Sequence, residues 1–232
     1  MSEKSLHYEY PKDVTEYIGK ELKRGNDFIV FDAGKDWVAK RPNFENISPK
    51  IQRELSQTEY YETLVTDTKK LTAIFGDNYE PAIFCPATDS RNFVLLQKRF
   101  KPEQFVAHQL LKRQLKGMEI DQYIEENREQ FSSIVFAAKK ALIEFGYPVD
   151  IQPANLVTED NKIIFIETDC PTYRAHNLFR FKDKAKKELE RLELYEKLLN
   201  LTEDEKRKLN SKYGIENDKF EDARNKVLES VG

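Results

Sequence analysis

Few residues in the 232-residue chain are suited to metal, disulfide or histidine chemistry. Its two cysteines, Cys85 and Cys170, lie far apart and form neither a disulfide framework nor a zinc-ligand spacing. Its three histidines, His7, His108 and His176, fit no metal-ligand pattern. The composition therefore argues against a zinc site and against a reaction centred on histidine.

Long hydrophobic runs and an excess of either charge are also absent. No apolar run approaches the roughly 18 residues that a membrane-spanning helix needs, and the N-terminal sequence lacks the apolar core of a secretion signal. Lys and Arg number 38 and Asp and Glu 41, so no basic excess points to nucleic acid or an anionic membrane. We expect a cytoplasmic protein without membrane or nucleic-acid partners.

The chain is rich in charged and aromatic side chains. Charged residues make up 34% of the sequence, against about 25% in typical globular proteins. The 15 Phe and 11 Tyr can still build a core, which excludes a chain that is disordered throughout. The length predicts one domain, or two lobes that share a core. Residues 182–232 carry balanced opposite charges, a pattern typical of solvated helix faces.

The first half of the chain is predicted to form strands and one helix. Gly34, in the turn 32–36, can take the positive φ that a hairpin needs. Ser48 and Pro49 are typical of a helix start and Gly76 of a helix end, so one helix is predicted between them. Short apolar runs bounded by turn residues predict strands at 28–31, 37–39, 82–85 and 92–96.

The second half is predicted to be mostly helical. Six apolar residues repeat with a helical period and predict a helix over 129–145 that ends at Gly146: Phe131, Ile134, Val135, Ala138, Leu142 and Phe145. Further helices are predicted at 105–115, 182–200, 203–212 and 216–230, and a strand pair at 156–157 and 163–166. This order predicts an α+β fold with a β-rich lobe, residues 1–97, and a helical lobe, residues 98–232.

The segment most informative about chemistry begins at Asp150, reaches Asn155 five residues later, and continues through the predicted hairpin to Asp169. A carboxylate and an amide thus lie on a loop after a buried helix, and a second carboxylate ends a buried strand. Hard cations bind oxygen ligands of this kind, and Mg²⁺ typically uses few protein ligands together with phosphate oxygens. The pattern is therefore suited to magnesium and a phosphate compound.

With this spacing the sequence resembles the protein-kinase-like superfamily, which includes small-molecule kinases of the aminoglycoside-phosphotransferase type. The resemblance implies that Asp150 is the base or orienter of an acceptor hydroxyl, and that Asn155 and Asp169 bind Mg²⁺. Upstream, Val38-Ala39-Lys40 is similar to the Val-Ala-x-Lys element of the family's third strand, shortened by one residue. Lys40 would then contact the α- and β-phosphates of ATP.

The resemblance also implies the remaining nucleotide contacts. Residues 23–30 are similar to the glycine-rich loop, with Gly25 at its middle glycine and the outer two glycines missing. Residues 93–99 resemble the strand that leads to the hinge between lobes, so the backbone from Gln97 to Arg99 would meet the adenine edge, beside Val38.

Lys40 has three candidate ion-pair partners on the helix that follows it. They are Glu54, Glu59 and Glu62. Glu59 is favoured because its distance from Lys40 along the chain resembles the family's spacing. Glu62 comes next because it lies on the apolar face of the helix.

Four departures from the family pattern are visible. Pro148 stands where the family usually has His or Tyr, and Asp169 is followed by Cys170-Pro171 in place of Phe-Gly. No Ala-Pro-Glu element follows, and the remaining chain is too short for the large helical subdomain of regulated protein kinases. Arg174 and His176 come shortly after Asp169, where they could bind a substrate anion or belong to a surface loop.

The resulting expectation is an ATP- and magnesium-dependent transferase of the kinase-like type, acting on a hydroxyl acceptor that is a small molecule in preference to a protein. One alternative is an inactive pseudokinase that binds a nucleotide or a protein partner, which the departures at Pro148 and after Asp169 favour. On a third interpretation, the protein has the same fold but transfers a nucleotidyl or other group, because a fold does not determine a reaction.

Overall fold

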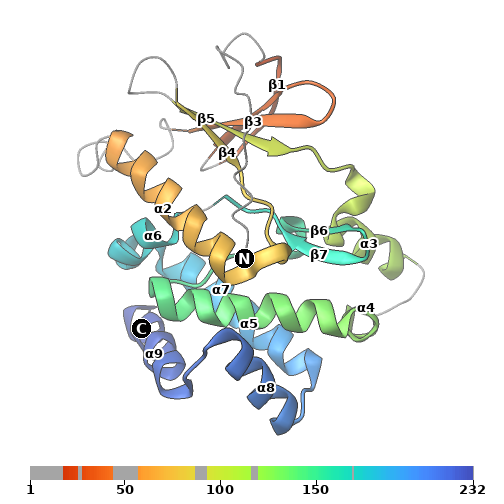
Figure 1. Cartoon of the computed structure of the whole chain (residues 1–232), viewed down its shortest axis with the longest axis vertical. Helices are drawn as coiled ribbons and strands as arrows, with labels where there is room; N and C mark the ends of the chain where they lie inside the picture. The colour runs from red at the N-terminus through yellow and green to blue at the C-terminus, as the bar shows by residue number, and fades with distance from the viewer. Residues whose placement is uncertain are drawn as a thin grey trace, which may run out of the picture. The chain divides into compact units, whose positions relative to one another are not determined.

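The computed structural model describes residues 18–25, 28–43, 57–86, 93–115, 120–168 and 170–231. The chain forms an α+β fold with a five-stranded antiparallel sheet and several helices. It divides into two compact units: residues 1–61 with 82–99, and residues 62–81 with 100–232. Figure 1 labels most of the helices and strands of the two units.

The first unit is built on the sheet. Its strands are β1 (Glu21–Arg24), β2 (Phe28–Asp32), β3 (Trp37–Pro42), β4 (Ile83–Pro86) and β5 (Phe93–Lys98), in the order β1-β2-β3-β5-β4. All neighbouring strands are antiparallel. The four predicted strands are confirmed, and β3 continues beyond the predicted Ala39 to Pro42. Strand β1 was not predicted because all four of its residues are exposed and show no apolar alternation.

Helix α2 (Gln57–Phe75) belongs to both units, since the boundary falls after Tyr61. Its first turns pack on the sheet, where the Tyr61 ring lies 5.0 Å from that of Phe93 and 5.9 Å from that of Phe84, centroid to centroid. The helix ends as predicted, with Gly76 following at a positive φ of 54°. Its predicted start at Ser48-Pro49 lies outside the described residues.

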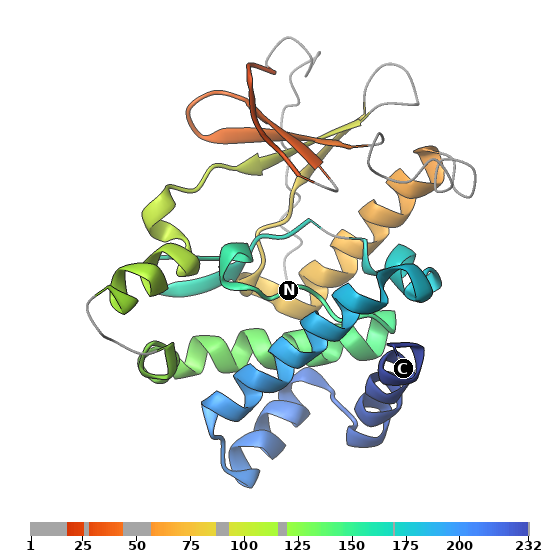
Figure 2. The same cartoon turned by 180° about the vertical axis from the view of Figure 1, so that it is seen from behind.

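Helix α5 (Arg128–Phe145) forms the centre of the second unit. All six apolar positions predicted from the helical period are buried. Gly146 follows at a φ of 67°, the left-handed conformation that ends a helix at least cost for glycine. Helices α7 (Leu178–Leu199), α8 (Glu203–Tyr213) and α9 (Asn217–Val231) pack against α5, and α7 crosses it (Figure 2). The predicted C-terminal helices are thus confirmed, although α7 begins earlier than residue 182.

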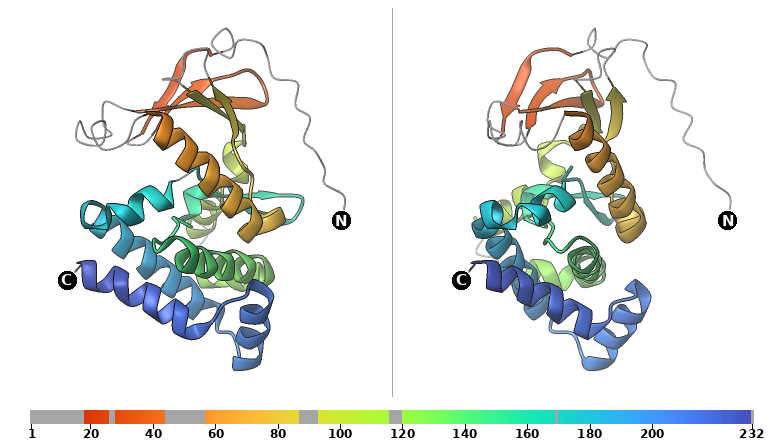
Figure 3. Two further views of the ribbon diagram at one scale, coloured as in Figure 1. Left: turned by 60° about the vertical axis from the view of Figure 1, so that its left-hand side comes forward. Right: turned by 90° about the vertical axis from the view of Figure 1, so that its left-hand side faces the viewer.

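The other α-helices and strands of the second unit include a two-stranded antiparallel hairpin. They are α3 (Val106–Gln114), α4 (Ile120–Glu126), β6 (Leu156–Glu159), β7 (Lys162–Phe165) and α6 (Pro171–His176). The hairpin turns at Asp160 and Asn161, both at positive φ, so its first strand extends further than predicted. Helices α4 and α6 are too short to show a helical period and were not predicted. Figure 3 shows the chain changing direction between α6 and α7.

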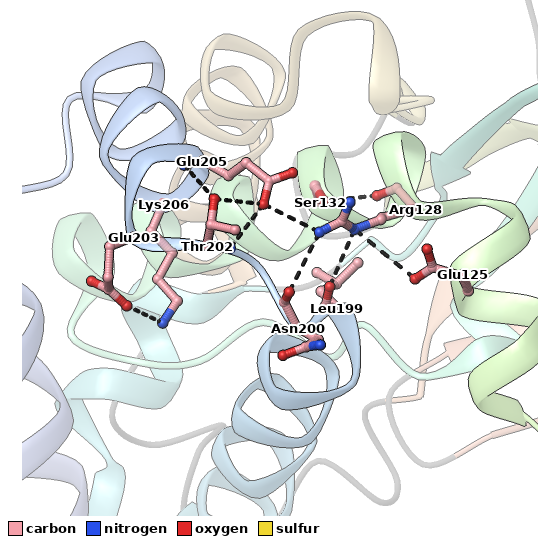
Figure 4. Close-up of polar contacts among 9 residues, drawn as sticks. All are labelled: Glu125, Arg128, Ser132, Leu199, Asn200, Thr202, Glu203, Glu205 and Lys206. Carbon is pink, nitrogen blue, oxygen red and sulfur yellow. Dashed lines mark hydrogen bonds and ion pairs between the residues drawn. The ribbon is translucent and has the colours of Figure 1, made fainter.

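A side chain of α5 binds the C-terminal end of α7 (Figure 4). The Arg128 guanidinium donates to the carbonyl oxygens of Leu199 at 3.2 Å and Asn200 at 3.4 Å, and it pairs with the Glu205 carboxylate at 3.2 Å. Glu205 also accepts from the Thr202 backbone N–H at 2.8 Å, as part of the capping box that begins α8. One cation therefore stabilises a helix end and orders the turn to the next helix.

None of the described helices combines the length and the apolar character that crossing a membrane requires.

Candidate functional site

The loop that carries Asp150 is held in place by apolar side chains. After the turn at Gly146, Tyr147, Val149 and Ile151 are all buried in the core of the second unit. Pro148 and Asp150 between them are buried as well, and the Ile151 N–H donates to the Val149 carbonyl oxygen at 3.1 Å before the 3-10 turn at Pro153–Asn155. The loop therefore has a defined backbone against which the polar side chains are oriented.

The Asp150 carboxylate is held by one of its two oxygens. Asp150 is only 6% exposed, and its Oδ1 accepts from the Gln152 backbone N–H at 3.3 Å. The same oxygen forms an ion pair with the Arg191 guanidinium of α7, which compensates a charge that would be costly to bury alone. Its Oδ2 has no partner among the described residues. One oxygen is thus fixed and the other is available to a hydroxyl group.

Asn155 joins this loop to the chain after the hairpin. Its Nδ2 donates to the Asp150 carbonyl oxygen at 2.9 Å and to Glu167 Oε2 at 2.7 Å, and its own carbonyl oxygen accepts from the Ile166 N–H at 3.0 Å. Because both side-chain partners are acceptors, the amide must present its nitrogen to them. The orientation of Asn155 is therefore determined by its hydrogen bonds.

This orientation bears on the predicted magnesium site. Asn155 Oδ1 makes no hydrogen bond within the described part of the chain, so it is left as an oxygen of the type that Mg²⁺ binds. Asp169 lies outside the described residues. Among the residues that are described, no three His, Cys, Asp or Glu side chains form a metal-binding group. The Asn155 amide oxygen is a suitable Mg²⁺ ligand. That Asn155 and Asp169 bind the same magnesium ion stays a prediction.

The segment after the hairpin is fixed by α2. Asp67 is fully buried and accepts from Thr172 twice, from the backbone N–H at 2.9 Å and from Oγ1 at 2.6 Å. Burial raises the pKa of Asp67, and the hydrogen bonds from Thr172 and Cys170 oppose that rise. The Glu80 N–H donates to the Phe165 carbonyl oxygen at 3.0 Å and extends the contact along β7.

Arg174 fits neither role that the sequence suggested for it. It lies in helix α6, not in a loop, and is 4% exposed. Its guanidinium is 3.7 Å from the Glu188 carboxylate and 5.8 Å from the ring centroids of both Tyr147 and Phe181. Arg174 is therefore part of the core, whereas His176 at the end of the same helix is exposed.

In the first unit, three predicted nucleotide-binding residues share one face of the sheet. Val38 pairs with Gln97 across β3 and β5, and Lys40 pairs with Leu95. Directly opposite residues point to the same face, and so do residues two apart on one strand. Val38, Lys40 and Gln97 are thus brought together. Phe93, on which the first turns of α2 pack, belongs to the same face by this alternation.

Arg99 is engaged within the sheet. Its guanidinium pairs with Asp32, and this hydrogen bond is the main cause that lowers the pKa of the Asp32 carboxyl. Its backbone N–H donates to the Asp36 carbonyl oxygen at 2.8 Å. Backbone N–H and C=O groups point to alternate sides along an antiparallel strand. Those of Gln97 therefore also point toward β3, whereas those of Lys98 point toward the β4 side. The pairing of β4 with β5 ends at Leu96.

Gly25 closes the turn between β1 and β2. Its N–H donates to the Phe28 carbonyl oxygen at 2.9 Å, and its own carbonyl oxygen accepts from Asn43 Nδ2 at 2.8 Å. A Cβ at position 25 would lie 3.1 Å from the Phe28 oxygen, so this close approach favours glycine.

The three acidic candidates for pairing with Lys40 differ in where they lie. Glu59 is an exposed residue near the start of α2 in the first unit. Glu62 is exposed and belongs to the second unit, and Glu54 lies outside the described residues. Which of them pairs with Lys40 stays a prediction.

Two residues of the Asp150 site were missed by sequence reasoning. Glu167 lies two positions before Asp169 and two after the last residue of β7, so its place shortly after a strand was a usable signal. Arg191 carried no such signal, because it is one of many charged residues in α7. Comparison with the models of known protein families gave no match, and comparison with curated protein sequences gave none either.

Proposed function

We propose that this protein is an ATP- and Mg²⁺-dependent phosphotransferase with a two-lobed, kinase-like fold that phosphorylates a hydroxyl group of a small molecule. The observation that carries the proposal is the position of Asn155, which is hydrogen-bonded to both the Asp150 backbone and Glu167. This bonding joins the two halves of the Asp150–Asn155…Asp169 pattern. The Asp150 loop and the chain that leads to Asp169 are thereby held together by side-chain hydrogen bonds.

In the second unit, Asp150 would accept a hydrogen bond from the acceptor hydroxyl through Oδ2, the oxygen without a partner in the described chain. Asn155 and Asp169 would bind Mg²⁺. When bound, the metal ion neutralises negative charge on the transferred phosphoryl group. Most of the rate would come from positioning and electrostatic stabilisation, since the protein forms no covalent bond in such a transfer.

In the first unit, Lys40 would contact the phosphates of ATP, with the turn at Gly25 nearby in the family arrangement. Val38 shares the sheet face of Lys40 and would supply apolar contact to the base. The backbone from Gln97 to Arg99, at the end of β5, would meet the adenine edge. Glu59 remains the preferred partner of Lys40.

The test is ADP formation from ATP and Mg²⁺, with water and then a panel of sugars, amino alcohols and nucleosides as acceptors. We expect Asp150→Ala to lower turnover about 100-fold or more, the size of effect typical of a general base. ATP binding, measured by thermal shift, should persist because Asp150 is assigned to the acceptor. The matched control is Asp183→Ala, an exposed carboxylate on α7. Turnover of Asp150→Ala at the level of this control would refute the assignment.

An inactive nucleotide-binding protein is the second candidate. It is favoured by the burial of Pro148 and Asp150, which leaves Asp150 only 6% exposed to an acceptor. On this reading ATP raises the melting temperature in a Mg²⁺-dependent way, but no acceptor is modified. Mass spectrometry of the acceptor panel would also separate phosphoryl from nucleotidyl transfer by the mass that is added.

A further inference from the structure

We propose that Arg191 is the positioning residue of the Asp150 carboxylate, and that it directs Oδ2 toward the acceptor hydroxyl. The inference rests on the proposed phosphotransferase function. It concerns a residue of α7, far from the kinase-like sequence pattern, and assigns it a role in the transfer step.

The argument begins with the planar carboxylate. Both contacts of the Asp150 side chain, from Arg191 Nη1 and from the Gln152 N–H, fall on Oδ1. Two donors on one oxygen restrict rotation of the group and leave the second oxygen in a defined direction. The hydrogen bond from the Gln152 N–H is long, at 3.3 Å, so the charged hydrogen bond from Arg191 is the stronger of the two.

The aromatic side chain of Tyr195 packs close to this pair. Tyr195 lies one turn further along α7, and its ring contacts the Phe131 ring of α5 at 5.7 Å, centroid to centroid. Burial, as the largest cause, raises the pKa of Tyr195 to about 12, with Arg191 and Asp150 acting on it in opposite directions. Tyr195 therefore stays uncharged at neutral pH and does not compete with Asp150 for the guanidinium. Packing of Tyr195 fixes the stretch of α7 from which Arg191 extends.

In the transfer step, the acceptor oxygen forms a bond to the γ-phosphorus and the bond from that phosphorus to the ADP oxygen breaks. The acceptor proton passes to Asp150 Oδ2. Arg191 touches none of the reacting atoms, and it acts by holding Oδ1. Losing it should slow the step without weakening ATP binding, because the binding residues lie on other elements.

The experiment compares Arg191→Ala and Arg191→Lys with Lys186→Ala, an exposed cation on another face of α7. ADP formation is measured with water as the acceptor, so that no identified substrate is needed. We expect Arg191→Ala to lower kcat about 10- to 100-fold, as for a misplaced catalytic group, with the KM for ATP unchanged. Arg191→Lys should retain more activity, and added methylguanidinium should partly restore Arg191→Ala. Lys186→Ala should behave like the wild type.

A double variant separates positioning from folding. In the Asp150→Ala background, Arg191→Ala should cause no further loss, since the residue that it positions is gone. Additive losses, or full activity of Arg191→Ala, would refute the role of Arg191 while leaving the phosphotransferase proposal intact. A wild-type protein that forms no ADP and shows no Mg²⁺-dependent ATP binding would refute the proposed function itself. If Arg191→Ala does not fold, the comparison of Arg191→Lys with Lys186→Ala decides.

Discussion

Buried charged residues of the second unit each have a partner from another element. Asp150 is paired with Arg191 from α7, and Lys139 of α5 lies 2.9 Å from the Glu196 carboxylate. Asp67 differs, because its partner Thr172 is neutral. Burial acts on this carboxyl more strongly than any one of its hydrogen bonds or the nearby charge of Lys70. Ionisation of Asp67 in the folded protein is therefore costly, which links its protonation to stability.

We expect Asp67 to make stability depend on pH. Its pKa in the folded state is raised above the ordinary value of 3.8, so the folded protein binds the proton more readily than the unfolded chain. Between 3.8 and the raised pKa, stability must then fall as pH increases. Asp67→Asn cannot titrate. Its free energy of unfolding relative to the wild type should rise through this interval, which urea denaturation at a series of pH values would measure.

The control for this measurement is Asp183→Asn, which removes an exposed carboxylate. Its difference from the wild type should stay nearly constant over the same interval, because an exposed group interacts little with the fold. A constant difference for Asp67→Asn as well would contradict the assignment of the pH dependence to Asp67.

At the scale of elements, helix ends are stabilised by a few specific polar contacts. Arg128 contacts the end of α7 and the start of α8 at once (Figure 4). The carbonyl groups at the end of a helix have no partner within it, so a cation there satisfies them and interacts favourably with the helix dipole.

We expect Arg128→Met to lower the free energy of unfolding by about 1 kcal/mol, a value reduced for the partial exposure of the side chain. Arg207→Met is the matched control. The Arg207 side chain is 79% exposed and its ion pair with Asp204 lies within one helix turn, so its loss should cost about 0.3 kcal/mol or less. Equal stabilities of the two variants in urea would show that the contact with α7 contributes nothing.

At the scale of the whole molecule, α2 belongs to both units, with its residues up to Tyr61 in the first and the rest in the second. Since hydrogen bonding along a helix is cooperative, we expect loss of structure in one unit to affect the other through α2. The chain offers a separate spectroscopic probe for the unfolding of each unit. Trp37, its one tryptophan, lies in β3 of the first unit, and helical circular dichroism reports mainly on the second.

We expect Leu142→Ala to lower stability by about 2–5 kcal/mol, because Leu142 is fully buried in α5. The midpoints of both the circular dichroism and the Trp37 fluorescence transitions should fall. Leu115→Ala, at a residue that is 80% exposed, should leave both unchanged. A shift in the circular dichroism alone would mean that the two units unfold independently.

Much of the secondary structure could be predicted because its causes are local. The helical period and Gly146 placed α5 within one residue of its observed range, and Gly76 marked the end of α2. Strand β1, α4 and α6 were missed because short polar segments show no period and depend on their neighbours. Arg174 was misjudged for a related reason, since its burial depends on Glu188 and two rings from other segments.

The sequence by itself determined the α+β character, the main elements and the spacing of Asp150 and Asn155, because these follow from residue types and short-range geometry. Only the tertiary structure decided which oxygen of Asp150 is occupied, how the Asn155 amide is turned, and which of the many charges of α7 faces inward. Sequence pattern identifies the charged face of a helix. A specific partner such as Arg191 emerges only when packing brings together residues that are distant in the chain.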